Sequence, residues 1–571
     1  MHKFFKVFLF FVLLNLSVIC FAADLDKPVS VFRLKNGQTV VIKEVHANPV
    51  VTISTWVKTG SAMETEKNNG ISHFLEHLMF KGTNKHPAGE FQKILEDKGA
   101  RCNAATSKDF TFYYITVASK FVDTALALHA DLMLNPVIPQ EEMDKERKVV
   151  QEEIRRSDDS PMRTLSGNLF SMIFSKHPYK MEILGTMENI ENVSRDEVLG
   201  YYKERYVPSN LVTVIVGDVN TQAMLEKVRA EFQEASNTEN KKVDFKATVQ
   251  PSLSKPAEKI AKGDYKTGYI LFGFKGVPIT NIKEGYALDM AAQILGGSES
   301  SRLYQTLKQD KNLVNSINAS HYSLKGDSVF LVLADFDPKK YEKVRAEIIK
   351  EIEKFRENPV TKEELERAKT LARRKFIYSN ESVENIAESI GYCMTAQGNI
   401  DCYNKHLRYI DDVKPYDIQN AVKKYISLDK YAMSVLLPEE TPVNITKPAV
   451  ETIKDSSRSV LNNGSVLITT KNTSNDIIAL NVFFKGGKLL EKKPGLASLL
   501  SKNLLYGTKN RPYKQLVEEI EDLGIAIDAY ANNDYIKISL KSTKEDFDKA
   551  FEILADIIKN PAFEEKYIQK N

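Results

Sequence analysis

Cysteine, tryptophan and an excess of charge of one sign are all scarce in this chain. Its 571 residues include four cysteines and one tryptophan, and 79 basic residues nearly balance 76 acidic ones, so the net charge is +3. So few cysteines do not make a disulfide framework. A nearly balanced charge gives no basis for nucleic acid or an anionic membrane surface as the main partner, and we expect no nucleic acid.

Three of the four cysteines, Cys102, Cys393 and Cys402, lie outside the N-terminal segment. A bridge between Cys393 and Cys402 is compatible with an oxidising compartment. The interpretation that the sequence favours is three buried thiols that act as small hydrophobic groups.

Long apolar runs are also missing, except at the N-terminus. There Lys3 and Lys6 precede the apolar run from Val7 to Cys20, and the small residue Ala22 follows. This is the order of a secretory signal. It predicts a signal peptide over residues 1–22, cleavage before Ala23, and a secreted or periplasmic protein. The alternative is an uncleaved anchor, for which the run is short; the protein would contact a membrane only in that case.

The remaining chain alternates between strand and helix patterns. Asn36-Gly37 predicts a hairpin turn, and β-branched alternation or helical periodicity predicts the other elements. We expect α+β domains, each a mostly antiparallel sheet packed with helices. Polar stretches near 236–258 and 439–456 read as linkers. The predicted domains are 29–236, 259–438 and 457–571, and in the first one we expect strands at 31–42, 50–58, 103–117 and 211–217 and helices at 121–134 and 139–156.

The last predicted domain repeats the first. Residues 495–508 resemble residues 70–83 at an offset of 425 positions, and the same offset aligns Asn135-Pro136 with Asn560-Pro561. A fixed offset over many positions indicates an internal duplication. In the copy, Ser498, Ser501 and Lys502 stand where the first domain has His73, Glu76 and His77. The copy is therefore expected to be inactive.

The segment His73-Phe-Leu-Glu76-His77 carries the chemistry. On a helix, positions i and i+4 share one face, so the two imidazoles can hold one metal ion. Glu76 lies close enough to act on a water molecule at that ion. The order H-x-x-E-H is the inverted zinc-peptidase signature.

A catalytic zinc ion needs a third protein ligand and one open position. A predicted helix over 141–156 offers Glu142, Glu146, Glu152 and Glu153. Glu146 and Glu153 are two helical turns apart on one face, whereas Glu152 points about 100° away. Val149 and Val150 lie between them, so we expect this face to point inward, where two carboxylates are costly unless paired or metal-bound.

Together these residues resemble the insulinase–pitrilysin inverzincins, a family that includes the mitochondrial processing peptidases. The matching segments are HFLEHLMFKGT at 73–83, Asn103-Ala104, ERKVVQEE at 146–153, HPY at 177–179, GT at 185–186 and YVPSNLVTVIVGDV at 206–219. In that family the third ligand lies 76 or 77 positions after the second histidine, and Glu153 lies 76 positions after His77. The resemblance implies one Zn²⁺ per chain on His73, His77 and Glu153, supported by Glu146.

The resemblance also implies the activity. It predicts a zinc-dependent endopeptidase that hydrolyses peptides or unfolded polypeptide segments, with Glu76 as general base and Glu146 in the catalytic site. Asn103 and Ala104 are expected to bind the substrate as an added strand, next to an aromatic strand at 110–114 that we expect to be an exposed edge. An ordinary sheet edge is the alternative.

The resemblance is incomplete in one respect. Two-half members of the family form a clamshell, and here the second half stops at Asn571, the counterpart of Glu146. We therefore expect a clamshell half plus a truncated second half, with a homo- or heterodimer as one way to complete it. The alternative function is a non-catalytic peptide-binding protein or a partner subunit of a peptidase complex.

Overall fold

The computed structural model describes residues 28–232, 250–438, 457–461, 465–469, 476–488, 491, 493, 495–532 and 535–569. The predicted signal segment and most of both predicted linkers lie outside the described residues. No helix within these ranges combines the length and the apolar character that a membrane span needs.

The first part of the chain forms a six-stranded sheet with the order β1-β2-β6-β3-β5-β4. Only β2 and β6 pair in parallel, and every other pair is antiparallel. The predicted strand at 103–117 is two strands joined by a tight turn, so it folds back on itself. The strands are β1 Ser30–Arg33, β2 Thr39–Glu44, β3 Val50–Val57, β4 Arg101–Thr106, β5 Thr111–Ala118 and β6 Leu211–Gly217.

Most helices of the same part cover one face of this sheet, whereas the helix Pro161–Ile173 packs on the second sheet. Their apolar stripes pack onto the inward side chains of the strands, such as Ile53 and Ile215, and form one core. The helices of this part are α2 Ile71–Met79, α3 Glu90–Asp97, α4 Val122–Leu134, α5 Gln140–Asp158, α6 Pro161–Ile173, α7 Met187–Asn192, α8 Arg195–Arg205 and α9 Thr221–Phe232.

A second, five-stranded sheet has the order β7-β11-β8-β10-β9 and is also mostly antiparallel. Its strands are β7 Ala257–Gly263, β8 Gly268–Lys275, β9 Ser316–Ser323, β10 Ser328–Phe336 and β11 Ala432–Pro438. Its helical segments are α10 Ile282–Gly296, η5 Tyr304–Asp310, α11 Tyr341–Glu357, α12 Lys362–Ser379, α13 Val383–Tyr392, η7 Cys393–Gln397, α14 Asp401–Asn404, α15 His406–Asp412 and α16 Pro415–Tyr425. The α+β fold class is thereby confirmed.

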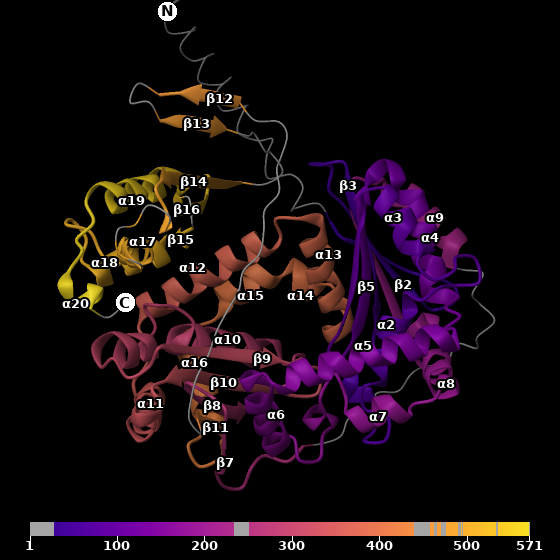
Figure 1. The fold of residues 1–571 in the computed structure, drawn as a ribbon, viewed down its shortest axis with the longest axis horizontal. Helices are drawn as coiled ribbons and strands as arrows, with labels where there is room; N and C mark the ends of the chain where they lie inside the picture. Colours follow the sequence, from indigo (N-terminus) through magenta and orange to yellow (C-terminus); the bar gives the residue numbers. More distant parts are fainter. Residues whose placement is uncertain are drawn as a thin grey trace, which may run out of the picture.

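The first two parts exchange helices. Helix α13 packs on the outer face of the first sheet, where Ile386 and Ile390 meet Trp56 and Val214, and Figure 1 shows α13 reaching that sheet. In return, α6 packs Leu169 and its neighbours on the second sheet. A side chain at Gly391 would collide with the indole of Trp56, so this contact is close. The exchange fixes the two sheets relative to each other.

The third part lies along α12 (Figure 1), and near the end of that helix Tyr378 donates a hydrogen bond to the carbonyl oxygen of Gly524. Arg367 of α12 forms an ion pair with Asp522 at 2.7 Å, and Ser298 donates a hydrogen bond to Glu521. The elements are β12 Ser457–Val460, β13 Val466–Thr469, β14 Ile477–Lys485, α17 Leu496–Asn503, α18 Tyr513–Asp522, β15 Ala526–Ala531, β16 Tyr535–Thr543, α19 Phe547–Lys559 and α20 Glu565–Ile568.

Contacts repeat at the offset of 425 positions. Thr83 donates a hydrogen bond to Asp131, and Thr508 donates one to Asp556. The bridges Thr83–Pro136 and Thr508–Pro561 match as well. Strand order β14-β16-β15 corresponds to β3-β5-β4 of the first sheet. These repeated contacts support a duplication, while the domain boundaries themselves stay a prediction.

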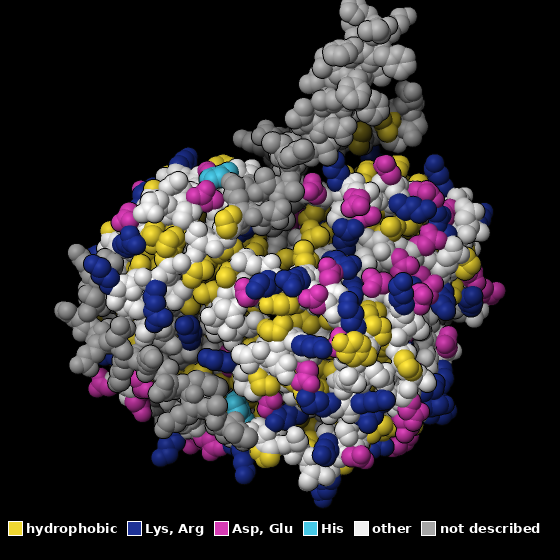
Figure 2. Space-filling view, turned by 180° about the vertical axis from the view of Figure 1, so that it is seen from behind, with side chains coloured by type: hydrophobic (Ala, Val, Ile, Leu, Met, Phe, Trp, Pro, Cys, Tyr) yellow, Lys and Arg dark blue, Asp and Glu magenta, His cyan; other side chains and the backbone are white. Residues whose placement is uncertain are grey.

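The surface agrees with the balanced composition. On the face seen in Figure 2, Lys and Arg side chains alternate with Asp and Glu, and the described residues of that face show no broad field of one sign. Cys393 and Cys402 form a disulfide, so the interpretation of three free buried thiols is wrong for these two. Cys102 alone among the described cysteines is free, and it is half-buried.

Candidate metal centre

A buried carboxylate holds the start of the histidine-bearing helix α2. Glu64 accepts hydrogen bonds from the backbone N–H groups of Gly70 and Ser72 at 2.8 and 2.9 Å. The first amides of a helix have no partner within the helix. A negative charge near them is attracted by the positive end of the helix dipole. Burial raises the pKa of Glu64, although these hydrogen bonds oppose the shift. Glu64 therefore fixes the helix end one turn before His73.

Gly70 allows this arrangement because its φ is +101°, a left-handed conformation that favours glycine. A Cβ atom at Gly70 would lie 2.8 Å from the Cα atom of Gly185 and from the carbonyl oxygen of Leu184. Two loops distant in sequence thus press backbone to backbone beside α2. The same pattern recurs in the third part, where Glu491 accepts from the amides of Gly495 and Ala497.

The structure brings together the three predicted metal ligands. One nitrogen of His73, one of His77 and one carboxylate oxygen of Glu153 all lie within 4.8 Å of one another. The Nε2 atoms of His73 and His77 are each 3.5 Å from Oε2 of Glu153. The histidines come from α2 and Glu153 from α5, which packs against it. Among the described residues, this is the one such group of three.

The electrostatics differ between the two histidines. Burial, with a smaller effect of the neighbouring His77, lowers the pKa of His73 to about 3, so its ring is neutral. Burial also disfavours charge on His77, but the hydrogen bond to Glu146 and the charges of Glu153 and Glu76 outweigh it and raise its pKa. A metal ion binds neutral imidazole, so binding here would release a proton from His77.

Glu146 orients His77. Its Oε1 lies 2.9 Å from Nδ1 of His77, and its Oε2 lies 2.6 Å from Nζ of Lys81. Burial opposes charge on Glu146, but these two partners outweigh it and lower its pKa. The ionised carboxylate accepts the Nδ1 proton of His77, so Nε2, on the side of Glu153, is the nitrogen that would bind a metal ion after its proton is released.

Glu76 lies between the histidines and the edge of the sheet. Its Oε2 accepts a hydrogen bond from Thr106 at 2.5 Å, at the end of β4. Burial raises the pKa of Glu76, and the Thr106 hydrogen bond partly offsets the rise. A carboxylate with a raised pKa at a metal centre suits proton transfer.

Strand β4, which carries Asn103 and Ala104, is the edge of the six-stranded sheet. Asn103 is exposed and Ala104 is buried. The expectation of an exposed edge at residues 110–114 is wrong, because β5 is paired on both sides, with β3 and with β4. The hairpin turn at 107–110 reverses the chain and leaves β4 outermost.

Two details of α5 differ from or extend the sequence prediction. Val150 is buried, but Val149 is 46 % exposed, because a position three residues after Glu146 has already turned away from the core. Glu152 faces solvent and pairs with Arg155 and Arg156, as its spacing predicts. Sequence reasoning missed Glu64, Thr106 and Lys81. The i+4 spacing of Lys81 from His77 is the one signal that could have found it.

The donor set fits zinc. Two imidazole nitrogens and one carboxylate oxygen are the ligands of a catalytic zinc site with one open position. His73 has no hydrogen-bond partner on Nδ1, a buried atom. Its lowered pKa gives the neutral form that a metal requires. His177 and His321 lie outside this group. His177 accepts a hydrogen bond from the backbone of Tyr179, and His321 is hydrogen-bonded to Asp289 and Ser328.

The model of "Insulinase (Peptidase family M16)" matches residues 39–187 and 466–571, and that of "Peptidase M16 inactive domain" matches residues 192–371. A protein named Zinc protease PqqE from Helicobacter pylori is 32% identical over 413 residues, which cover 71% of this chain and 91% of that protein. The chain belongs to the insulinase family, peptidase family M16. The same model matches both the histidine-bearing part and the third part.

Other family relatives have similar names. An uncharacterized zinc protease of Rickettsia felis is 29% identical over 398 residues, 70% of this chain and 95% of the relative. The crystal structure of a protease from Helicobacter pylori matches with a TM-score of 0.69 and 29% identity, over 72% of this chain and 99% of that chain. The periplasmic protease PqqL from Escherichia coli shares the fold, with a TM-score of 0.62 and 15% identity over 94% of this chain and 66% of that chain.

Proposed function

We propose that this M16-family chain is a zinc-dependent endopeptidase that cleaves peptides or unfolded polypeptide segments. The observation that carries the proposal is the convergence of His73, His77 and Glu153 within 4.8 Å. These residues would hold one Zn²⁺ per chain. When bound, a zinc ion supplies Lewis acidity, which activates water and polarises the scissile carbonyl.

Glu76 is proposed as the general base. It would take a proton from the attacking water and pass it to the leaving amine. Its position supports this role, because Thr106 holds one carboxylate oxygen at the end of β4 while the other remains available. Glu146 would act through His77, by fixing the tautomer that presents Nε2.

The substrate is proposed to bind as an extra strand on the edge of β4. Strand addition uses backbone hydrogen bonds and places few demands on sequence, which suits unfolded segments. Asn103 and Ala104 lie on that edge strand, and the hydrogen bond between Thr106 and Glu76 brings the strand's end to the proposed base. A peptide on this edge would therefore pass the metal centre.

The remaining predictions complete the proposal. A signal peptide over residues 1–22 would direct the protein to the periplasm or outside the cell, and the relative named a periplasmic protease is consistent with that. The third part would be an inactive copy, since Ser498, Ser501 and Lys502 stand where the first part has His73, Glu76 and His77. A second chain could complete the enclosure.

The proposal is tested by metal exchange. The purified protein is stripped with a chelator, then reconstituted with zinc, and cleavage of an unstructured fluorogenic peptide is followed. We expect activity to disappear and return, and a Glu153→Ala protein to bind less zinc and stay inactive. Glu152→Ala, at the adjacent exposed position, is the control and should behave as wild type. Full activity of Glu153→Ala would refute the ligand assignment.

A further inference from the structure

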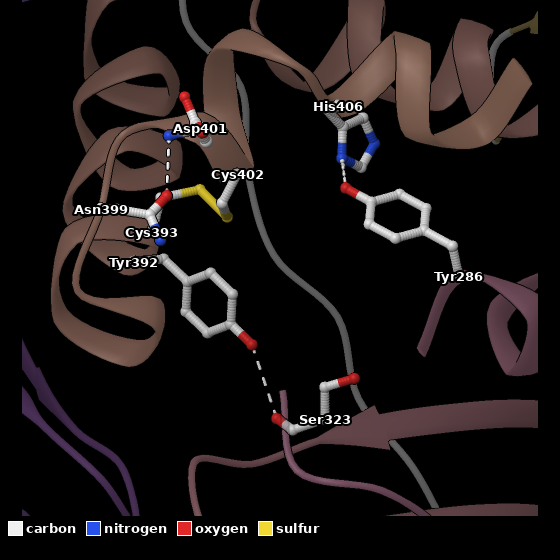
Figure 3. Close-up of a disulfide and its surroundings, with 8 residues drawn as sticks. All are labelled: Tyr286, Ser323, Tyr392, Cys393, Asn399, Asp401, Cys402 and His406. Carbon is white, nitrogen blue, oxygen red and sulfur yellow. Dashed lines mark hydrogen bonds between the residues drawn. A yellow bond between two sulfur atoms is a disulfide. The ribbon is translucent and has the colours of Figure 1, made fainter. Parts of the chain in front are cut away.

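A small cavity in the second part of the chain, far in sequence from the metal ligands, is lined by aromatic rings, aliphatic and small polar side chains, and one carboxylate. Its volume is about 240 Å³, and it lies between α10, β9, α12, α13 and the disulfide Cys393–Cys402. Figure 3 shows Tyr392 on one side of this space and the Tyr286–His406 pair on the other, with the disulfide along one border. The rings are those of Tyr286, Phe376, Tyr392, Tyr403 and His406.

The rings are held in place by one another. Tyr286 forms a hydrogen bond of 2.7 Å with Nδ1 of His406. The ring of His406 stacks on Phe376 with centroids 4.4 Å apart, and Phe376 contacts Tyr403 at 5.7 Å. The disulfide joins η7 to α14 and so fixes the wall between Tyr392 and Tyr403. These contacts hold the rings around the cavity, where aromatic rings can contact a cation.

Asp289 supplies the one carboxylate of the cavity lining. Its Oδ1 lies 2.7 Å from Nδ1 of His321, whose Nε2 lies 2.8 Å from the buried hydroxyl of Ser328. These contacts orient the carboxylate, yet its side chain remains 42% exposed. Within the described residues, His321 is the only ion-pair partner of Asp289, and no Lys or Arg lines the cavity.

The charge of Asp289 acts throughout the cavity. After burial, its field is the largest cause that raises the pKa of both Tyr286 and Tyr392. Burial lowers the pKa of His406, so this ring adds no positive charge at neutral pH. Aromatic rings and a carboxylate that no Lys or Arg of the cavity lining neutralises attract a cation and repel an anion.

We propose that this cavity binds an ammonium or guanidinium group, either on a basic peptide side chain or on a small free amine. The volume sets the size of the ligand, because drug-sized ligands need roughly 300–1,000 Å³. A single basic side chain or a short amine fits the smaller space. The inference does not depend on peptide hydrolysis.

Calorimetry on the full chain tests the proposal with two matched probes, Nα-acetyl-lysine amide and the neutral Nα-acetyl-norleucine amide, which has the same four-carbon chain without the ammonium group. We expect the lysine amide to bind about tenfold more tightly or better. Asp289→Asn retains an oxygen for His321 and removes the charge, so it should abolish this preference. Tyr392→Leu should weaken binding of the lysine amide, and the exposed Asp429→Asn is the control that should leave binding unchanged.

Equal binding of the two probes to the wild-type protein would overturn the proposal, and that comparison needs no variant. Binding of lysine amide that survives both Asp289→Asn and Tyr392→Leu would overturn it too. Two further probes distinguish a peptide side chain from a free amine as the ligand. They are an unstructured peptide with one lysine and the diamine cadaverine, and each is compared with a neutral counterpart. Preference for the lysine peptide identifies a peptide side chain, and preference for cadaverine alone identifies a free amine.

Discussion

Nδ1 of His77 lies 2.9 Å from the Oε1 atom of Glu146, and the same carboxylate contacts Lys81 through its other oxygen. This contact joins the two helices of the metal centre without using the nitrogen that would face the ion. It makes Glu146 a positioning residue, distinct from the three proposed ligands.

Glu146→Gln should lower zinc affinity by about 10- to 100-fold, the range seen when a partner of a metal-bound histidine is removed. The amide cannot carry the charge that stabilises the Nδ1 proton of His77. Competition with a calibrated chelator measures the affinity. Glu142→Gln, one turn earlier on the same helix, is the matched control; equal affinity of the two variants would show that Glu146 does not support the site.

Thr106→Val should shift the acidic limb of the rate profile. The Thr106 hydroxyl stabilises the ionised form of Glu76. Without it the pKa of Glu76 rises further, and a base is lost as pH falls through its pKa. We therefore expect the limb of kcat/KM to move to higher pH while kcat/KM at high pH changes less. Thr52→Val, which removes a hydroxyl that is hydrogen-bonded to Thr116 on the same sheet, is the comparison. An unmoved limb in Thr106→Val would show that Thr106 does not tune the pKa of Glu76.

Gly70→Ala should destabilise the fold by about 3 kcal/mol, because left-handed strain adds to a backbone collision. Gly89 has a similar φ of +85° but open space around it. Gly89→Ala should therefore cost only about 1 kcal/mol. Urea unfolding measures both. Equal losses would mean that the contact between Gly70 and Gly185 is unimportant for stability.

Stability should also depend on His129, which is fully buried. Burial lowers its pKa to about 3 from an ordinary 6.5. The unfolded chain therefore binds a proton that the folded chain does not, so stability is present above about pH 6.5 and falls toward pH 3, by up to about 1.4 kcal/mol per pH unit. In His129→Gln the slope of the unfolding free energy against pH should be smaller by the amount that one proton contributes, about 1.4 kcal/mol per pH unit. Thr55→Val keeps the ring and should keep the slope.

The sequence predicted which three residues the structure brings together, but not the residues that hold them in place. Helical spacing placed His73 and His77 on one face, and the family resemblance chose Glu153 from four glutamates. The spacing of Lys81, four residues after His77, could have predicted its place beside the site. The place of Glu64 could not be predicted in this way, because Glu64 caps α2 from a loop whose path depends on the contact of Gly70 with Gly185.

The fold was predicted to a similar extent. The hairpin at Asn36-Gly37 and the buried strand β6 follow from local patterns. The exchange of α6 and α13 between the two sheets does not, because an amphipathic helix shows which face it buries but not which sheet covers it. The edge position of β4 depends on a turn that propensity alone did not reveal.

The most direct test of the central claim is zinc content and peptide cleavage measured on the same preparation of Glu76→Gln. Glu76 is proposed as the base and not as a ligand. We predict about one zinc ion per chain, as in the wild type, and cleavage of an unstructured peptide slower by about 10²- to 10⁴-fold. Cleavage at the wild-type rate by the zinc-loaded variant would contradict the account.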